Sequence, residues 1–237
     1  MKNKTLNPVR VSILVAILAL MVTLALITSK TVDVFSVYKQ IRSANCVVID
    51  AGHGGVDGGA VSCTGVYESQ INLQIAIRLN DLMQLLGYET KMIRSEDISV
   101  YTNGKTIAQK KISDLKERVR VINNTRNAVL ISIHQNYFQD GRYSGAQVFY
   151  AKNSQMFANT MQQQFRQTLN PGSNRKIKKA DGIYLMENIN CDAILIECGF
   201  LSNKTEEFHL RDPNYQKKIC CVISTVTAQY LNNQAVA

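Results

Sequence analysis

The chain has 237 residues and a formal net charge of +9, with 46% hydrophobic and 19% charged residues. This length predicts one well-buried domain and a short additional segment, and it leaves no room for a second full domain. The basic charge is typical of proteins that meet anionic polymers, but it also suits an ordinary solvated surface, so charge alone does not define a function.

Residues 11–29, "VSILVAILALMVTLALITS", form an uncharged apolar run. A run of this length spans a bilayer, since about 20 helical residues cross the hydrocarbon core. Lys2, Lys4 and Arg10 precede it, so the positive-inside rule predicts that residues 1–10 are cytoplasmic and that the chain after Lys30 is exported. A cleaved signal peptide is the alternative, but its apolar region is usually about 7–15 residues long, and no A-x-A site follows here. We therefore expect a membrane anchor at 11–29 and a linker at 30–44.

Nucleic acid is not an expected partner, because the chain is predicted to be exported and has no basic helix with interleaved aromatic residues. The six cysteines also need an interpretation, because exported proteins often form disulfides. Two of them are neighbours within a helical pattern, one opens a strand, and no C-x-x-C pair occurs, so we expect small buried hydrophobic side chains rather than disulfides or a zinc site. They are Cys46, Cys63, Cys191, Cys198, Cys220 and Cys221.

Strand-like and helix-like patterns alternate along the predicted domain, residues 45–233. Strands are expected at 46–50, 88–93, 129–133, 145–151 and 193–197, and helices at 68–87, 112–126, 154–169 and 214–231. The basic stretch 174–180 reads as a solvated loop. The expected inward positions of the helices are Ile71, Ile75, Leu79, Leu82 and Leu86; Ile112, Leu115, Val119 and Ile122; Phe157, Met161, Phe165 and Leu169; and Tyr215, Ile219, Val222 and Val226. This alternation predicts an α/β fold with a twisted, mostly parallel sheet covered by helices on both faces, preceded by one N-terminal transmembrane helix.

Three ionisable residues come at the carboxyl ends of predicted core strands. His53 follows "VVIDAG", His134 follows "VLISI", and Glu197 ends "AILIE". Open α/β sheets place their functional sites at this edge. Glu68 begins the first long helix, after a loop rich in glycine, and such a loop can return the helix start to the strand end because glycine admits conformations that other residues resist.

Two imidazoles and one carboxylate leave one zinc position open for water, which is the pattern of catalytic zinc. Zinc lowers the pKa of that water to about 7, and a carboxylate outside the metal's ligands then moves the proton. The pattern predicts that His53, Glu68 and His134 bind zinc and that Glu197 transfers protons.

Each residue also has a simpler interpretation. A histidine at a strand end is often a hydrogen-bonding surface residue, and Glu68 would favour the helix dipole by about 0.3–1 kcal/mol. Glu197 is harder to explain this way, since an acid ending a buried strand costs free energy unless it is paired or functional. Phosphate binding is disfavoured because Asp57 stands where the third glycine of G-x-G-x-x-G belongs and no P-loop lysine is present.

Five motifs together resemble the zinc-dependent N-acetylmuramoyl-L-alanine amidases of bacterial cell walls, the amidase type 3 family. They are "VVIDAGHGGVDGGA", "YESQINLQIAIRL", "ISIHQN", "GAQVFY" and "ILIECGFLSNKTE". The resemblance implies one zinc ion held by His53, Glu68 and His134, with Glu197 as the catalytic glutamate. It also implies hydrolysis of the amide between the lactyl group of N-acetylmuramic acid and L-alanine of the peptidoglycan stem peptide.

A narrower resemblance to the germination-specific amidases of spore formers rests on the N-terminal apolar run, "SGAQVFY", "DGIYLMENI" and "YQKKI". It implies work in the spore cortex, where a separate muramic acid deacetylase completes muramic δ-lactam, and it suggests a sporulation protein as a further partner. The domain would then lie between the two forespore membranes. A vegetative cell-wall amidase, and an anchored wall-binding protein without catalysis on the same fold, remain the alternatives.

Overall fold

The computed structural model describes residues 9, 12–13, 15–27 and 45–234. The chain divides into two units, Met1–Ile41 and Arg42–Ala237. In the first unit, residues 12–13 and 15–27 of the predicted anchor are helical. None of the helices in the described ranges combines the length and the apolarity needed to cross a membrane. The predicted cytoplasmic segment 1–10, apart from Val9, and the predicted linker 30–44 lie outside the described residues.

The second unit is built on one six-stranded sheet with the strand order β2-β1-β3-β6-β4-β5. All neighbouring strands run parallel except β4 and β6, which are antiparallel. The mostly parallel sheet predicted from the sequence is therefore confirmed. The strands are β1 (Cys46–Ala51), β2 (Glu89–Met92), β3 (Ala128–Asn136), β4 (Gln147–Tyr150), β5 (Lys178–Lys179) and β6 (Asp192–Phe200), and the helices are α2 (Glu68–Leu85), α3 (Ile107–Asn123), α4 (Gln155–Thr168), α5 (Tyr184–Asn188), α6 (Lys204–Arg211) and α7 (Pro213–Gln234).

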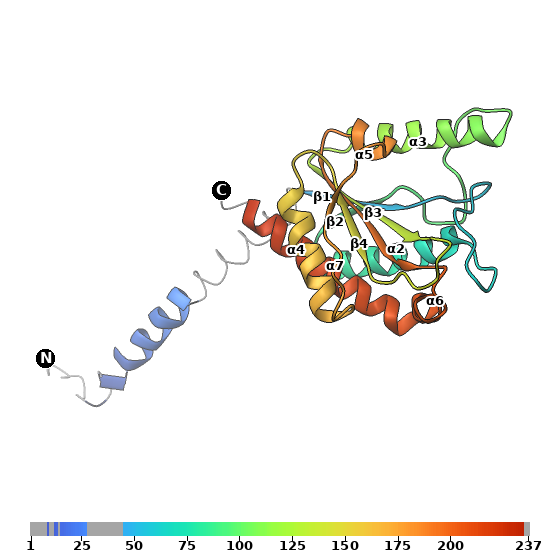
Figure 1. Ribbon diagram of the computed structural model, residues 1–237. Coiled ribbons are helices and arrows are strands. Elements are labelled where there is room, and N and C mark those ends of the chain that lie inside the picture. The colour runs from blue at the N-terminus through green and yellow to red at the C-terminus, as the bar shows by residue number, and fades with distance from the viewer. Residues whose placement is uncertain (1–8, 10–11, 14, 28–44, 235–237) are drawn as a thin grey trace, which may run out of the picture. The chain divides into compact units, whose positions relative to one another are not determined.

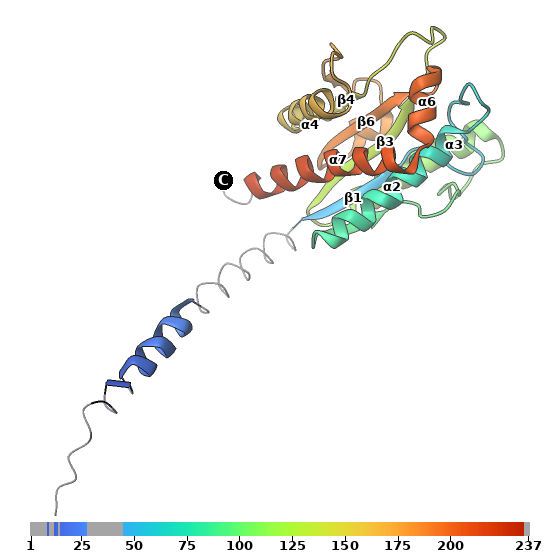
Figure 2. The same cartoon turned by 90° about the horizontal axis from the view of Figure 1, so that it is seen from below.

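Helices cover both faces of this sheet, as predicted. Helices α3 and α5 lie over one face, while α2, α4 and α7 lie over the other (Figures 1 and 2). Successive residues of a strand point to opposite faces, and Val47 and Val48 of β1 accordingly belong to different apolar clusters. All six residues of β1 are buried, which explains why the central strands read as continuous apolar runs.

The predicted inward face of α3 was wrong at one end. Ile112 is 56% exposed, whereas Ser113, Arg118 and Ile122 are buried. Arg118 takes the inward position one turn before Ile122, and it forms an ion pair with Asp50 of β1. The other inward positions predicted for the helices are buried or partly buried.

Three short elements were missed. The basic stretch 174–180 contains β5, which pairs with β4 over two residues, and α5 and α6 were not predicted. Helix α6 is capped by Asn203, whose side-chain oxygen accepts hydrogen bonds from the backbone N–H groups of Thr205 and Glu206. An asparagine followed three residues later by a glutamate resembles a capping box, so this helix start was readable in the sequence.

All six cysteines are free thiols in the structure. Cys46, Cys198 and Cys220 are buried, and Cys191 is partly buried. The prediction of buried side chains was wrong for Cys63 and Cys221, which are exposed.

Candidate metal centre and active site

The four residues singled out in the sequence come from four neighbouring elements. His53 follows β1, His134 lies near the end of β3, and Glu197 lies in β6. His134 and Glu197 are register partners across the parallel β3 and β6 pair. Glu68 is the first residue of α2. Strand β3 continues to Asn136 and β6 continues to Phe200. His134 and Glu197 therefore lie within the last residues of these strands, and not in the loops that follow them.

His53, Glu68 and His134 form a compact cluster. Their ligand-type atoms all lie within 4.8 Å of one another. The Nε2 atom of His53 is 3.2 Å from Glu68 Oε2, and the Nδ1 atom of His134 is 3.0 Å from Glu68 Oε1. The two imidazole rings meet edge to face with centroids 5.0 Å apart. The Glu68 carboxylate therefore contacts one ring nitrogen of each histidine.

Two glycines provide the space for this cluster. A Cβ atom at Gly52 would overlap the Cε1 and Nε2 atoms of the His134 ring. At Gly59, where φ is +70°, a Cβ atom would lie 2.6 Å from Glu68 Oε2 and 2.7 Å from His53 Cδ2. Glycine is therefore required at these two positions, because the backbone lies so close to the site residues that any side chain would occupy the site.

His53 itself has a backbone that few non-glycine residues adopt, with φ at 61°. Arg118 holds this conformation: its Nη2 donates a 2.7 Å hydrogen bond to the His53 carbonyl, and its Nη1 donates to the Ala51 carbonyl and to Asp50. Burial lowers the pKa of Arg118, but the charges of Asp50 and Asp114 outweigh burial and raise it. A strained backbone at a cluster of ionisable side chains is a recurring property of functional sites.

A second buried arginine, Arg94, fixes the same turn from the other side. Its Nε donates to the Ala51 carbonyl at 2.8 Å, and its Nη2 donates to the carbonyls of Gly52 and Ser69 at 2.9 Å each. Neither arginine was predicted from the sequence to belong to the site. Arg118 was detectable, because it shares the helical face of Leu115 and Ile122, whereas no pattern marks Arg94.

Asp57 positions His53 and was not predicted to do so. Its Oδ2 lies 2.9 Å from Nδ1 of His53, and its Oδ1 lies 2.7 Å from Nζ of Lys111. Burial lowers the pKa of His53, but the hydrogen bonds with Asp57 and Glu68 outweigh burial and raise it to about 9. A carboxylate on the far nitrogen of a histidine fixes its tautomer and ring orientation, as in many metal sites.

Glu68 is buried and accepts hydrogen bonds on both oxygens. Oε2 accepts from the Ala60 N–H at 3.0 Å, and Oε1 accepts from Asn72 Nδ2 and the Gln135 N–H at 3.1 Å each. Burial raises the pKa of Glu68, but hydrogen bonds and charges from His134 and His53 outweigh burial and hold it well below its usual value. Glu68 is therefore ionised and fixed in orientation.

Glu197 differs from Glu68 in having an unsatisfied oxygen. Its buried Oε2 has no hydrogen-bond partner among the described residues. Burial raises the pKa of Glu197 to about 7; the charge of Glu68 also raises it, while His134 and His53 lower it. An orphaned carboxylate oxygen is costly unless it serves a ligand or a reaction.

The donor set fits a zinc ion. Zinc accepts imidazole nitrogen and carboxylate oxygen at about 2.0–2.2 Å, which places neighbouring tetrahedral ligands roughly 3.4 Å apart. The separations of 3.2 Å between His53 Nε2 and Glu68 Oε2, and of 3.0 Å between His134 Nδ1 and Glu68 Oε1, are close to that spacing. The carboxylates of Asp57 and Glu68, which raise the pKa of His53, also place negative charge around the cluster.

A mostly parallel α/β sheet with this cluster and a buried carboxylate at its carboxyl edge has the arrangement of a metal-assisted hydrolase. Residues 47–226 match the N-acetylmuramoyl-L-alanine amidase family. The chain belongs to this family of enzymes, which hydrolyse the link between glycan and stem peptide in peptidoglycan.

Known relatives agree with this assignment. The germination-specific N-acetylmuramoyl-L-alanine amidase of Bacillus subtilis is 36% identical over 197 residues, covering 81% of this chain and 82% of the relative. The CwlD amidase of Clostridioides difficile, solved in complex with the GerS lipoprotein, is 36% identical with a TM-score of 0.76, and the match covers 79% of this chain and 98% of that one. An N-acetylmuramoyl-L-alanine amidase from Clostridium difficile 630 is 30% identical with a TM-score of 0.69, covering 80% and 98%.

Proposed function

We propose that the chain is a zinc-dependent amidase that releases stem peptides from muramic acid in the spore cortex. His53, Glu68 and His134 would hold the zinc ion, one per chain. When bound, zinc polarises the substrate carbonyl and makes water more acidic. Asp57 keeps Nε2 of His53 directed at the cluster by holding Nδ1, and the backbone N–H groups of Ala60 and Gln135 keep the Glu68 carboxylate fixed.

Glu197 would carry the proton. Its Oε2 has no partner among the described residues, so it is free to accept a proton from the attacking water and return it to the nitrogen of the departing L-alanine. A pKa of about 7 suits this transfer in both directions at neutral pH. This orphaned oxygen beside a three-ligand cluster is the observation that carries the proposal.

The test uses the full chain in detergent, loaded with zinc, and a muramyl peptide as substrate. Glu197→Gln keeps the shape of the side chain and should lower kcat by about 10²–10⁴-fold with stoichiometric zinc retained. His134→Ala should lose both zinc and activity. Stoichiometric zinc in a wild-type protein that releases no peptide would support the wall-binding alternative and overturn the enzymatic one.

The cortex role is supported by the similarity to the germination-specific amidase of B. subtilis. In that role, a muramic acid deacetylase would act on the product, and the complex of the related CwlD with the GerS lipoprotein makes a protein partner of similar kind a reasonable expectation. Muropeptide analysis of spores with and without this chain is the test. Loss of muramic δ-lactam supports the role, whereas unchanged lactam points to the vegetative wall.

The proposed domain organisation adds a membrane anchor at 11–29, a linker at 30–44 and a catalytic domain at 45–233, exported to the space between the forespore membranes. Its support is the uncharged run after Lys2, Lys4 and Arg10. Fractionation tests it: the full chain should sediment with membranes and resist extraction by salt and alkali. Recovery of a shortened chain in the soluble fraction would favour a cleaved signal peptide.

A further inference from the structure

A row of polar side chains extends across the sheet beyond the candidate metal centre. His134, Glu197 and Gln147 are register partners on the adjacent strands β3, β6 and β4. Paired residues of neighbouring strands project from the same face of a sheet. The Nε2 atom of Gln147 donates a hydrogen bond to the Lys176 carbonyl, so the row continues to the segment that carries β5.

Arg175 ends this row on the same face. A register shift in β6 places Phe200 opposite Asn136, two residues after His134, and this returns the Phe200 side chain to the face of Glu197. The guanidinium of Arg175 lies over the Phe200 ring at 4.4 Å. Gln147, the register partner of Glu197 one strand away, also contacts Arg175, so with a strand spacing of about 5 Å the guanidinium lies on the order of 10 Å from Glu197.

The Arg175 side chain is fixed but retains an available donor. Nε donates to the Ser144 carbonyl at 2.6 Å, and Nη1 donates to Gln147 Oε1 at 3.2 Å. Among the described residues no carboxylate lies within 4.0 Å of the guanidinium, and none accepts a hydrogen bond from Nη2. Partly buried guanidinium groups without an anion are suited to bind carboxylates.

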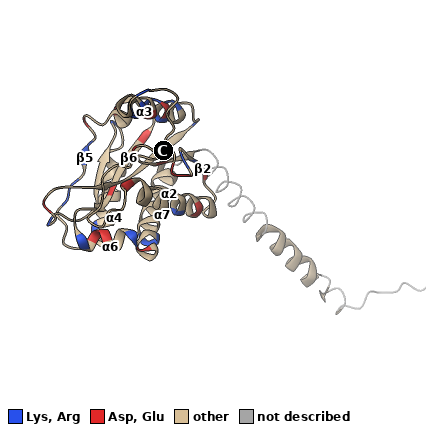
Figure 3. Cartoon of the chain, turned by 90° about the vertical axis from the view of Figure 1, so that its right-hand side faces the viewer, with Lys and Arg blue, Asp and Glu red and all other residues tan. Residues whose placement is uncertain are grey.

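A hollow of about 780 Å³ opens beside Arg175, and Lys178, Arg142 and Glu206 also line it. Lys178 is exposed and makes no ion pair with any described residue, and β5 itself consists of two lysines at the sheet edge (Figure 3). Arg142 is already paired with Asp140 at 2.7 Å.

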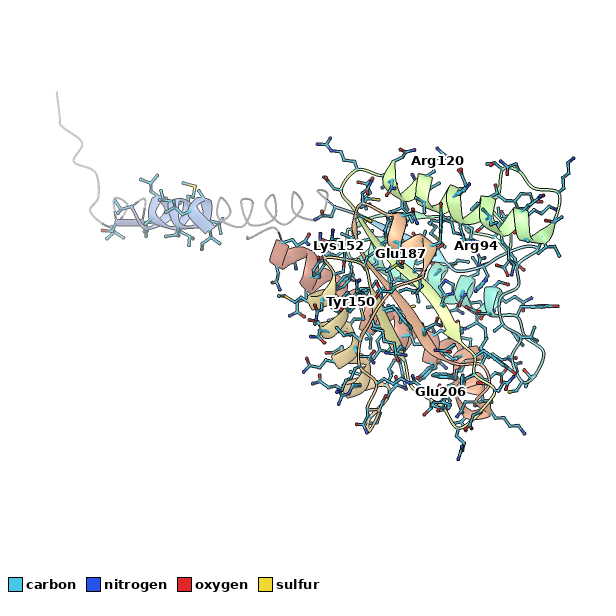
Figure 4. The ribbon with its side chains drawn as sticks, turned by 45° about the horizontal axis from the view of Figure 1, so that its top comes forward. Arg94, Arg120, Tyr150, Lys152, Glu187 and Glu206 are labelled. Atoms are coloured by element: carbon cyan, nitrogen blue, oxygen red, sulfur yellow. The ribbon has the colours of Figure 1, made fainter. Side chains whose placement is uncertain are left out.

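Glu206 is the acidic residue that lines this hollow, and hydrogen bonds to the backbone already hold its carboxylate. Its oxygens accept the backbone N–H groups of Gly145 and Phe200 at 2.8 Å each. It lies at the opposite end of the sheet from Tyr150 and Lys152 (Figure 4). Because β4 pairs Gln147 with Glu197 and Tyr150 with Ile194, the hollow lies at the end of the sheet that carries the candidate metal centre.

We propose that Arg175 and Lys178 form a subsite that binds the carboxylates of the stem peptide beyond its first alanine. This inference rests on the proposed amidase function. About three extended residues span 10 Å, so carboxylates on the second or third residue of the stem reach the guanidinium when the scissile amide lies beside Glu197. An acidic peptide matches the basic hollow in charge.

The test compares two forms of one probe, a stem tripeptide with free carboxylates and the same tripeptide with those groups as carboxamides. Calorimetry with the zinc-loaded full chain in detergent measures binding of the free peptides, which contain no muramyl amide to hydrolyse. The wild type should bind the acidic form about tenfold more tightly, as expected for a charge-assisted hydrogen bond. Arg175→Ala should reduce this preference to less than about twofold.

Arg142→Ala is the matched control, since it removes an arginine of the same hollow that Asp140 already neutralises. It should keep the tenfold preference. Lys178→Gln replaces an exposed side chain, and it should reduce the preference about threefold even if Arg175→Ala folds poorly. Equal affinities of the wild type for both peptides, or an unchanged preference in both Arg175→Ala and Lys178→Gln, would overturn the subsite.

The binding measurement also separates this inference from the proposed function. If the wild type binds the acidic peptide selectively but releases none from a muramyl tripeptide, the amidase proposal fails and the carboxylate subsite stands. If it releases peptide from the acidic and amidated substrates with equal kcat/KM, the amidase proposal stands and the subsite fails.

Discussion

At the scale of single residues, the absence of a side chain at Gly52 is as important as the histidines. A Cβ atom there would overlap the His134 ring, so the ring would have to move. We expect Gly52→Ala to displace His134 and to lower kcat/KM by about 10²-fold or more, because displacements near 1 Å have effects of this size. Kinetics and zinc content of the purified full chain measure the effect.

Gly65→Ala is the control for this prediction. Gly65 lies in the same loop with φ at +89°, but a Cβ atom there would have no neighbour within 4 Å. Its replacement should cost roughly 1 kcal/mol of stability from backbone strain, with zinc binding intact. Equal loss of zinc in both variants would show that loop strain, rather than contact with His134, is responsible.

The carboxylate of Asp57 should tune metal affinity without touching the metal. Since Asp57 holds Nδ1 of His53, Asp57→Ala should weaken zinc binding by about 10–100-fold, the usual effect of losing such a partner. Competition with a chromophoric chelator measures the affinity. Lys111→Gln removes only the lysine that pairs with Asp57. It should change the zinc affinity by less than about threefold. A larger effect from Lys111 than from Asp57 would contradict this order.

Residues at strand ends were predictable because the strand pattern is strong and parallel strands share a carboxyl edge. His53, His134 and Glu197 were selected as candidates in this way and Glu68 through the glycine-rich loop, and the structure brings His53, Glu68 and His134 together. Asp57 was not found, because a single acid within a loop has no period or neighbour that marks it. Its role depends on the left-handed turn at His53, which exists only in three dimensions.

At the scale of elements, a buried ion pair between Arg118 and Asp50 links α3 to β1 beside the site. Arg118 is 2% exposed and pairs with Asp50 and Asp114. We expect Arg118→Met to lower the free energy of unfolding by about 3–5 kcal/mol, because removal of one partner leaves a buried charge unpaired. Urea denaturation of the full chain in detergent measures this change.

The double variant Asp50→Asn/Arg118→Met tests the cause. It should be less destabilised than the sum of the single variants, since the two groups interact directly. Strict additivity would mean that Arg118 stabilises the domain through its other contacts, such as its hydrogen bonds to the carbonyls of Ala51 and His53, and not through its charge on Asp50.

The same helix shows where sequence periodicity fails. Spacing of apolar residues placed Ile112 inward, yet it is exposed, while Arg118 is buried. Periodicity treats a charged residue as a marker of the solvent face, but a buried acid on a neighbouring strand reverses that assignment. Helices α2, α4 and α7 carry apolar residues on their inward faces, and their predicted faces were correct.

At the scale of the whole molecule, stability should depend on acid pH through Asp50. Burial raises the pKa of Asp50, but the charge of Arg118, the charge of His134 and the hydrogen bond from Ser132 outweigh burial and lower it. A carboxyl group whose pKa is lower in the folded state contributes stability above its unfolded pKa of about 3.9, and this stability is lost as pH falls through the folded value.

Asp50→Asn isolates this contribution from those of Asp57 and Glu68, whose pKa values are also lowered. The difference in unfolding free energy between wild type and Asp50→Asn should be constant from about pH 7 to 5 and should shrink below about pH 4. Urea titrations across this range measure it. A difference that stays constant down to about pH 2 would show that Asp50 keeps the same pKa on unfolding.

Metal binding should also stabilise the domain as a whole, because the three predicted ligands come from the loop after β1, from α2 and from β3. Zinc at about 100 times its Kd adds roughly 2.7 kcal/mol to a protein that binds it only when folded, which corresponds to about 5–10 °C in Tm for a domain of this size. Differential scanning fluorimetry with and without zinc measures the shift. Glu197→Gln should keep it and His134→Ala should lose it, whereas an equal shift in His134→Ala would place the zinc elsewhere in the chain.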